Sequence, residues 1–175
     1  LLNSPRILVC GDADFAYATA LADSLRELQP PAHIFASAYE PEPELLSRYP
    51  HAAAAMASLE RSGVAVRCGV DAREIQSHYQ DHSFHRIIFN LPQSPPAPKA
   101  RNQIQRHRAL LRDFCHSAAG SLAPRGELWI TLLAGQGGTP MDPISRMPGD
   151  TWQIQQQAAT AGLLVKAVAS ADLDA

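Results

Sequence analysis

Acidic side chains follow three apolar runs of the sequence, each at the point where the run stops. Asp12 and Asp14 come after "ILVC", Glu40 comes after "IFASAY", and Asp71 comes after "VAVRCGV". In an open parallel sheet the carboxyl ends of the strands meet at one edge, where ligands bind. Two carboxylates beside a diphosphate would repel it. The pattern therefore favours a ligand with positive charge, such as the cofactor S-adenosylmethionine, which carries a sulfonium and an ammonium group.

Each of these positions has an expected role toward such a cofactor. Gly11 allows a sharp turn into a helix whose first backbone N–H groups are free to bind a ligand. Glu40 is placed to accept hydrogen bonds from both ribose hydroxyls. Asp71 is placed to accept the adenine amine, with the N–H of Ala72 donating to a ring nitrogen. Two alternatives stay open, because Glu40 could cap the helix that Pro41 begins and Asp71 could be a helix N-cap.

A fourth apolar run ends in Asn90-Leu91-Pro92. This tripeptide has the shape of the N/D-P-P-Y loop with which many base-modifying methyltransferases hold a planar nitrogen at the methyl donor. The asparagine carboxamide offers both a donor and an acceptor, and Pro92 stiffens the turn. We therefore predict that the catalytic residues are these three together with Asp14. The alternative is an ordinary exit from a strand.

Basic residues gather directly after this turn, in "PKARNQIQRHRALLRDF". The formal net charge of the chain is −2, so nucleic acid is not attracted by the charge of the whole protein. A local cluster can still contact an RNA backbone. We predict RNA contacts from it, with a solvated helix face as the alternative; the residues concerned are Lys99, Arg101, Arg106 and Arg108.

Apolar runs with strand character alternate with segments of helical spacing along the chain. This alternation predicts an α/β fold, an open and mostly parallel sheet with helices on both faces. Pro50 is expected to split one alanine-rich segment into two helices, and Asp150 or Thr151 is expected to cap the last helix, which stops at Gly162. Strands are expected at residues 6–10, 33–39, 64–70, 85–91, 127–134 and 162–169.

Length and composition limit the other classes of function. The 175 residues fit one domain, 1–175. No run approaches the roughly 20 apolar residues of a membrane span, so no membrane partner is expected. Three scattered cysteines without a C-x-x-C pair argue against a disulfide scaffold or a cysteine zinc site. No metal site is predicted, since His78, His82 and His85 are better explained as loop histidines.

Taken together, "ILVCGDADF", "SAYEPEPELLSRYP", "GVDA" and "HRIIFNLPQ" resemble the large-subunit rRNA (uridine-N3) methyltransferase-like family. Its members are class I, Rossmann-fold enzymes that use S-adenosylmethionine. The resemblance implies rRNA or a pre-ribosomal particle as partner. An intracellular location is expected from the scattered cysteines, with the nucleus or nucleolus and the mitochondrion as open alternatives. The resemblance also implies cofactor contacts from the acids named above and a target base beside Asn90.

The sequence departs from this family at three places. The family's first loop reads G-E-G-D-F-S and its fourth-strand loop reads F-N-F-P-H, whereas this chain has Ala13 for the second glycine and Gln93 for the histidine. The family's last edge strand has no counterpart here. The second functional hypothesis is therefore a catalytically inactive methyltransferase-like component of a ribosome or other ribonucleoprotein, assembled with other subunits.

Overall fold

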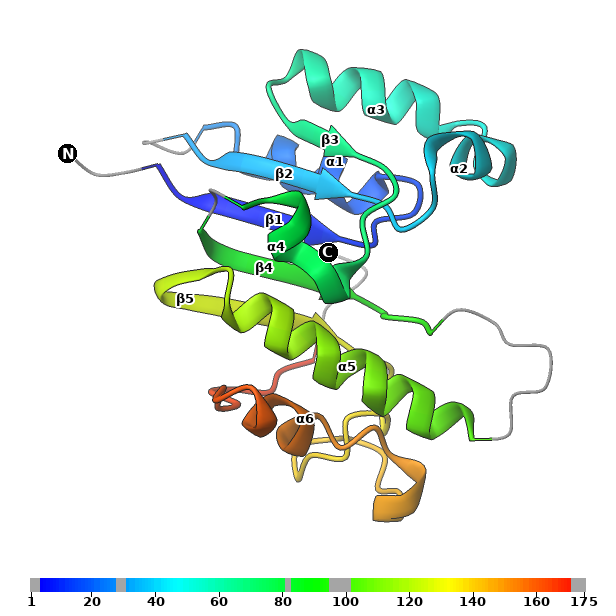
Figure 1. Ribbon diagram of the computed structural model, residues 1–175, viewed down its shortest axis with the longest axis vertical. Helices are drawn as coiled ribbons and strands as arrows, with labels where there is room; N and C mark the ends of the chain where they lie inside the picture. Colours follow the sequence, from blue (N-terminus) through cyan, green and yellow to red (C-terminus); the bar gives the residue numbers. More distant parts are fainter. Residues whose placement is uncertain (1–3, 28–30, 81–82, 95–101, 171–175) are drawn as a thin grey trace.

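The computed structural model describes residues 4–27, 31–80, 83–94 and 102–170. Its centre is a five-stranded sheet in which all neighbours are parallel, in the order β3-β2-β1-β4-β5 (Figure 1). The chain builds outward from β1 to β3 and then returns to the other side of β1 with β4. The switch of strand order therefore lies between β1 and β4. The strands are β1 (Arg6–Cys10), β2 (His33–Ser37), β3 (Ala65–Arg67), β4 (Phe84–Asn90) and β5 (Leu122–Thr131).

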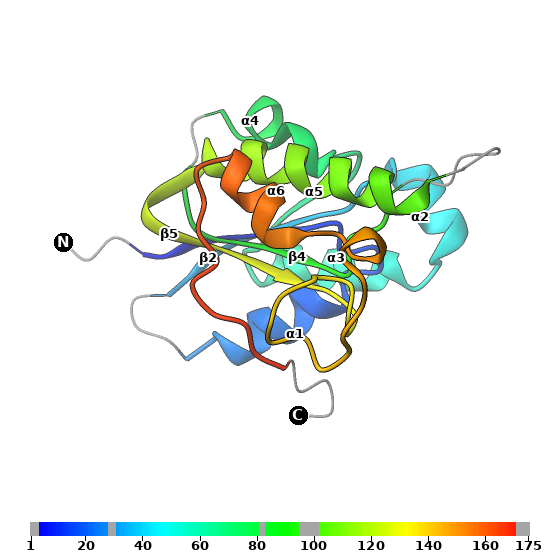
Figure 2. The same cartoon turned by 90° about the horizontal axis from the view of Figure 1, so that it is seen from below.

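Helices cover both faces of the sheet (Figure 2). One face carries α1 (Ala16–Ser24) and α3 (Ala52–Arg61), with α2 (Glu42–Arg48) leading into α3. The other face carries α4 (Ile75–His78), α5 (Gln103–Ala119) and α6 (Ile154–Thr160). Short 3-10 turns precede α4 and α6, namely η1 (Ala72–Glu74) and η2 (Pro148–Asp150). This is the Rossmann-like α/β architecture that the alternation of strands and helices predicts.

The central strands are buried on both faces because helices pack on both. On the α5 side, Phe89 of β4 meets Phe114 of α5 edge to face, with ring centroids 4.7 Å apart. On the α1 side, Phe15 and Ala18 pack with Leu59 of α3. Burial of these apolar side chains supplies most of the favourable free energy of folding. It also holds the carboxyl ends of the strands at fixed positions, on which any site at that edge depends.

Several local expectations are confirmed. The chain breaks between α2 and α3 around Pro50, and Gly162 follows α6 with a φ of 73°, as a helix-ending glycine should. None of the described helices combines the length and the apolar character that crossing a bilayer requires.

Three expectations about elements are wrong. The apolar run at 162–169 forms no strand: its described residues lack ladder partners and Leu164 is 90% exposed. An apolar run cannot be a strand without a neighbour to pair with, and the hydrogen bond shown between the described part of this run and β5 joins side chains, Lys166 to Glu127 (2.8 Å). The residue that caps α6 is Gln153, not Asp150 or Thr151. Strand β5 also begins earlier than expected, at Leu122, which pairs with Phe84; the register is irregular between this pair and the pair of Arg86 with Glu127.

Candidate functional site

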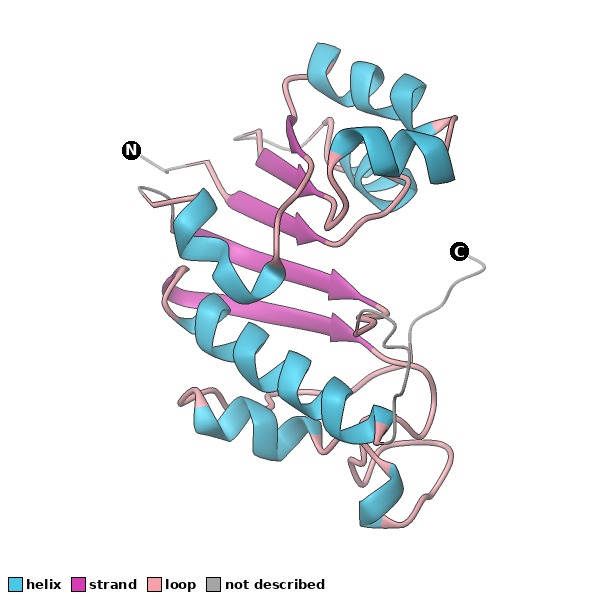
Figure 3. Ribbon diagram, turned by 45° about the vertical axis from the view of Figure 1, so that its right-hand side comes forward, coloured by secondary structure: helices cyan, strands magenta, loops and turns pink. Residues whose placement is uncertain are grey.

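The carboxyl ends of all five strands point to the same edge of the sheet (Figure 3). The loops that follow β1, β2 and β3 are joined there by backbone hydrogen bonds. The N–H of Asp12 donates to the carbonyl of Ser37 (3.0 Å), and the N–H of Gly69 donates to the carbonyl of Glu40 (2.9 Å). The structure therefore brings the predicted cofactor loops together as one connected surface.

The first loop turns at Gly11, which has a φ of 66°. A Cβ at this position would lie 2.7 Å from a ring carbon of Phe89, so the glycine is required by conformation and by packing. The only other left-handed residue of this loop is Phe15, at the start of α1. Ala13, which replaces a glycine of the related family, is not left-handed and carries no backbone strain of that kind.

The carboxylate of Asp12 caps α1 from within the fold. Its Oδ2 accepts the N–H of Ala18 at 2.6 Å, and the carboxylate also accepts the N–H of Tyr17. Burial raises the pKa of Asp12, and these two hydrogen bonds oppose that shift in part. Two of the helix N–H groups expected to face a ligand are therefore already paired.

Asp14 is the more accessible acid of the first loop, with 39% of its side chain exposed. Its Oδ1 accepts the N–H of Ala16 (3.1 Å), and its Oδ2 lies 3.4 Å from Nε2 of His51. His51 belongs to the turn between α2 and α3. Sequence reasoning missed it, because nothing local distinguishes it from the other histidines; only the fold places it beside the first loop.

Glu40 and Asp71, the acids after β2 and β3, are each paired with an arginine. Oε1 of Glu40 lies 2.5 Å from Nη1 of Arg48 on α2, and the Glu40 side chain is only 17% exposed. Asp71 accepts Nε of Arg73 on both carboxylate oxygens. Hydrogen bonding from Arg73 lowers the pKa of Asp71. Asp71 also caps η1 by accepting the N–H of Arg73, which confirms the N-cap alternative. Sequence reasoning missed both arginines.

The turn after β4 is fixed by the neighbouring strand. Oδ1 of Asn90 accepts the hydroxyl of Thr131, the last residue of β5, at 2.6 Å. The next N–H, that of Leu91, donates to the carbonyl of Thr131 (2.9 Å). Leu91 has a φ of 47° and is 43% exposed, while Pro92 is fully buried. An exposed leucine held in the left-handed region is strained, and such strain is concentrated at functional sites.

Gln93 connects this turn to the region that follows β5. Its carboxamide lies 3.3 Å from Nε2 of His107, which is buried in α5 and stacks on Trp152 with 4.1 Å between ring centroids. Nδ1 of His107 lies 2.9 Å from the carbonyl oxygen of Gln103. The atom of the Gln93 carboxamide that faces Nε2 is the oxygen Oε1, so both ring nitrogens of His107 have a polar partner. The polar residue after Pro92 therefore anchors the turn to α5.

The four residues predicted to contact RNA do not share one environment in the structure. The guanidinium of Arg108 donates to the carbonyls of Thr151 (2.6 and 2.9 Å), Pro148 (2.8 Å) and Gly149 (3.0 Å), so it clamps the segment before α6. Arg106 lies on α5 and is half-buried. Lys99 and Arg101 lie outside the described residues. An RNA contact by any of the four remains a prediction.

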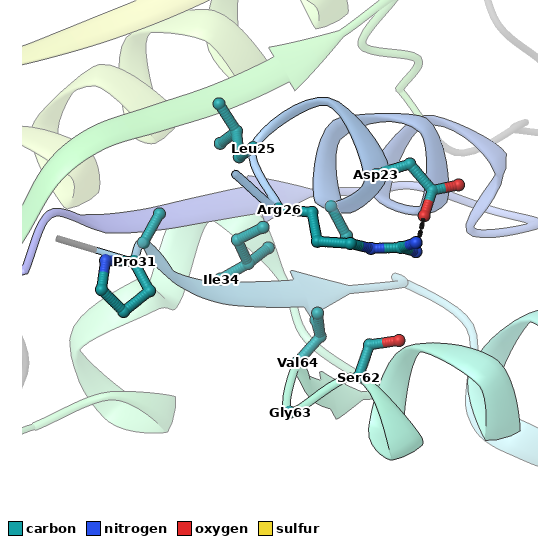
Figure 4. A pocket seen from close by; sticks show the side chains of 10 residues that line it. Asp23, Leu25, Arg26, Pro31, Ile34, Ser62, Gly63 and Val64 are labelled. Carbon is teal, nitrogen blue, oxygen red and sulfur yellow. Dashed lines mark hydrogen bonds and ion pairs between the residues drawn. The ribbon is translucent and has the colours of Figure 1, made fainter. Parts of the chain in front are cut away.

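The described surface has hollows outside the loops at the carboxyl ends of the strands. One, of about 520 Å³, is open and lies along α2, where Arg48 contributes to its lining. Another, of about 160 Å³, lies between the end of α1, the start of β2 and the α3–β3 turn (Figure 4). Ile34 and Val64 line it beside the ion pair of Asp23 with Arg26. This smaller pocket is at the amino ends of the strands and does not belong to the candidate site.

Comparison with known proteins places this geometry in context. The family model described as "BMT5-like: rRNA (uridine-N3-)-methyltransferase BTM5-like" matches residues 8–173. Ferredoxin-fold anticodon-binding domain-containing protein 1 of Homo sapiens is 32% identical over 165 residues, and its Mus musculus homologue is 34% identical over 166. Both alignments cover 93% of this chain, which spans about a quarter (25%) of the length of each relative.

Among solved structures, a protein described as a short-chain alcohol dehydrogenase from Burkholderia multivorans has a similar fold. Its TM-score is 0.53 at 13% sequence identity, over 91% of this chain and 73% of that one. Identity this low supports the Rossmann-like fold alone.

Proposed function

We propose that this chain, which belongs to the BMT5-like rRNA (uridine-N3-)-methyltransferase family, binds S-adenosylmethionine and methylates N3 of an rRNA uridine. The cofactor would lie at the carboxyl ends of β1, β2 and β3, and the base at the turn after β4. The observation that carries the proposal is the hydrogen-bonded set of loops at this edge, next to the point where strand order switches.

The residues at the strand ends fit an adenosyl group. Oε2 of Glu40 has no partner among the described residues, because Arg48 contacts only Oε1, so a ribose hydroxyl can donate to it. Arg48 is 62% exposed, and an ion pair to such an exposed side chain is weak. The adenine amine would compete with Arg73 for Asp71, while the N–H of Ala72 remains beside it. Gly11 keeps the first loop close to the sheet. A contribution of Asp12 and Asp14 to the positive end of the cofactor remains a prediction.

When bound, S-adenosylmethionine supplies a methyl group that is already activated by the sulfonium. The protein therefore mainly orients the base and removes water. Uridine N3 loses its proton as its bond to the methyl carbon forms, and a nearby group must accept that proton. Asp14 is the acceptor we propose, since the Asn90 oxygen already accepts the Thr131 hydroxyl and a carboxamide is a very weak base. His51, next to Asp14, would hold the carboxylate in place.

A base inside an RNA helix must leave its stack to reach this turn, or be reached in a single-stranded state. The exposed side chain of Leu91 is placed to contact such a base. Arg106, together with Lys99 and Arg101, is proposed to hold the flanking RNA backbone.

Transfer of a labelled methyl group tests the proposal. The chain is incubated with tritiated S-adenosylmethionine and unmodified large-subunit rRNA, and the modified nucleoside is identified after digestion. We expect 3-methyluridine, and at least tenfold less of it with Asn90→Ala, since this variant removes the group that orients the base. Another methylated nucleoside would reject the uridine assignment. Cofactor binding without any transfer would favour the hypothesis of an inactive ribonucleoprotein component.

A further inference from the structure

We propose that Thr131 determines which bases the site accepts. Its hydroxyl fixes the Asn90 carboxamide so that the NH2 group faces the base, which selects a carbonyl oxygen next to the reacting nitrogen over an amino group. The inference rests on the proposed function, because it assumes that the target base lies at Asn90. It concerns a different property, the choice between bases, and is tested separately.

The distance between the two side chains identifies which end of the carboxamide meets Thr131. The contact is 2.6 Å long. Hydrogen bonds of the O–H···O type are commonly about 2.7–2.8 Å, whereas those of the N–H···O type are commonly about 2.9–3.0 Å. A 2.6 Å contact therefore fits a hydroxyl that donates to Oδ1. With Oδ1 toward β5, Nδ2 points away from it.

The backbone holds both residues in this arrangement. Asn90 and Thr131 are register partners in the parallel pair of β4 and β5, and the N–H of Leu91 donates to the Thr131 carbonyl. Thr131 is β-branched, which restricts its χ1 angle within a strand. Rotation of the carboxamide by 180° would place an NH2 group against the hydroxyl and would lose the short contact. The orientation is thus set by the fold before any base arrives.

The exposed group is then a pure donor. Asn90 is half-buried, and among the described residues no acceptor faces Nδ2. In uracil the reacting N3 lies between two carbonyl oxygens, and an N–H donor can pair with either. In cytosine one neighbour of N3 is an amino group, whose hydrogens would oppose those of Nδ2. A donor on the C4 side of N3 pairs with uracil but is left unpaired by cytosine, whereas on the O2 side both bases offer a carbonyl; the preference for uracil therefore comes from the C4 side.

The fixed orientation of the Asn90 carboxamide also favours the methyl-transfer reaction itself. As the proton leaves N3, negative charge spreads onto the flanking carbonyl oxygens of uracil. A fixed N–H donor next to one of these oxygens stabilises that charge without rearranging. Thr131 is in this sense a positioning residue: it does not touch the base but determines what Asn90 offers to it. The sequence alone leaves both the donor and the acceptor of Asn90 open.

Binding of two short RNAs tests this role without requiring catalysis. Fluorescence anisotropy compares fluorescein-labelled hexauridylate with hexacytidylate, whose phosphates are identical. We expect the wild-type chain to bind hexauridylate about tenfold more tightly. Thr131→Val, which keeps the shape but lacks the hydroxyl, should reduce this ratio below about twofold. Thr131→Ser, which restores the hydroxyl, should recover most of it.

Equal affinity of the wild-type chain for the two RNAs, or no binding of either, would overturn the inference. So would a loss of discrimination in Thr131→Ser equal to that in Thr131→Val. Melting curves of the three proteins check that the fold is retained, and a titration with S-adenosylmethionine should give the same affinity for all three. If the wild-type chain fails to bind the cofactor but still discriminates between the RNAs, the proposed function fails while the role of Thr131 stands.

Discussion

Replacing Asp12 with alanine should destabilise the fold, because this carboxylate caps α1 rather than only facing a ligand. The substitution removes acceptors from the N–H groups of Tyr17 and Ala18. Loss of an N-cap acceptor costs about 0.5–2 kcal/mol. Hydrogen bonds to a charged group lie at the upper end of that range, but removing a partly buried charge returns some of the loss. We therefore expect the free energy of unfolding to fall by about 1–2 kcal/mol.

Thermal unfolding measures this cost directly. For a chain of 150–250 residues, 1 kcal/mol corresponds to about 2–4 °C in Tm, so Asp12→Ala should melt about 2–8 °C below the wild type at pH 7. Asp12→Asn is the matched control, since it keeps an oxygen acceptor for the Ala18 N–H. It should melt within about 2 °C of the wild type. A wild-type Tm for Asp12→Ala, combined with a loss of affinity for S-adenosylmethionine, would refute the capping role and make Asp12 a ligand instead.

The raised pKa of Asp12 gives the same pair of proteins a pH signature. A carboxyl whose pKa is higher in the fold than in the unfolded chain favours the protonated native state. Its contribution to stability is complete below the unfolded value, about 4, and is lost as the pH rises through the folded value. Asp12→Asn has no carboxyl to ionise at this position, so it does not lose this stability as the pH rises. Its stability relative to the wild type should therefore increase between pH 4 and pH 7, and an unchanged or decreasing difference would contradict the burial of the Asp12 charge.

Two further substitutions address the arginines. Arg48→Met should tighten binding of S-adenosylmethionine by up to about fivefold in calorimetry, because an exposed ion pair worth at most about 1 kcal/mol no longer competes for Glu40; weaker binding would mean that Arg48 itself contacts the ligand. Arg108→Leu should lower the free energy of unfolding by about 1–3 kcal/mol in urea, since the carbonyls of Thr151, Pro148 and Gly149 lose their donor. Arg108→Lys should recover only part of this, because an ammonium lacks the planar fork; unchanged stability in Arg108→Leu would leave RNA contact as the remaining role.

Local patterns in the sequence were sufficient to predict most of the fold. Apolar runs and helical spacing predict six strands, of which five form, and the helices between them; the break at Pro50 follows from the chemistry of proline alone. The position of a polar residue directly after a strand predicts where it lies along the sheet edge, because all parallel strands end there. This reasoning places Glu40, Asp71 and Asn90 at one edge without any long-range information.

What the sequence could not predict depends on contacts between distant residues. The sequence predicts that the acids lie at the ends of the strands, but it does not predict which arginines pair with them. Ion pairs form wherever the fold brings two flexible side chains together. The hydroxyl of Thr131 lies 41 positions from Asn90, and only the register of β4 and β5 aligns them. The run at 162–169 failed as a strand for the same reason: its composition favours a strand, but strand formation needs a partner.

Calorimetric titration of the chain with S-adenosylmethionine tests the central claim most directly, because the proposed methyl transfer depends on a cofactor at these strand ends. We predict saturable binding of one molecule, weakened at least tenfold in Glu40→Gln, which keeps the size of the side chain but not its charge. No heat of binding at millimolar cofactor, or equal affinity in Glu40→Gln, would contradict the claim.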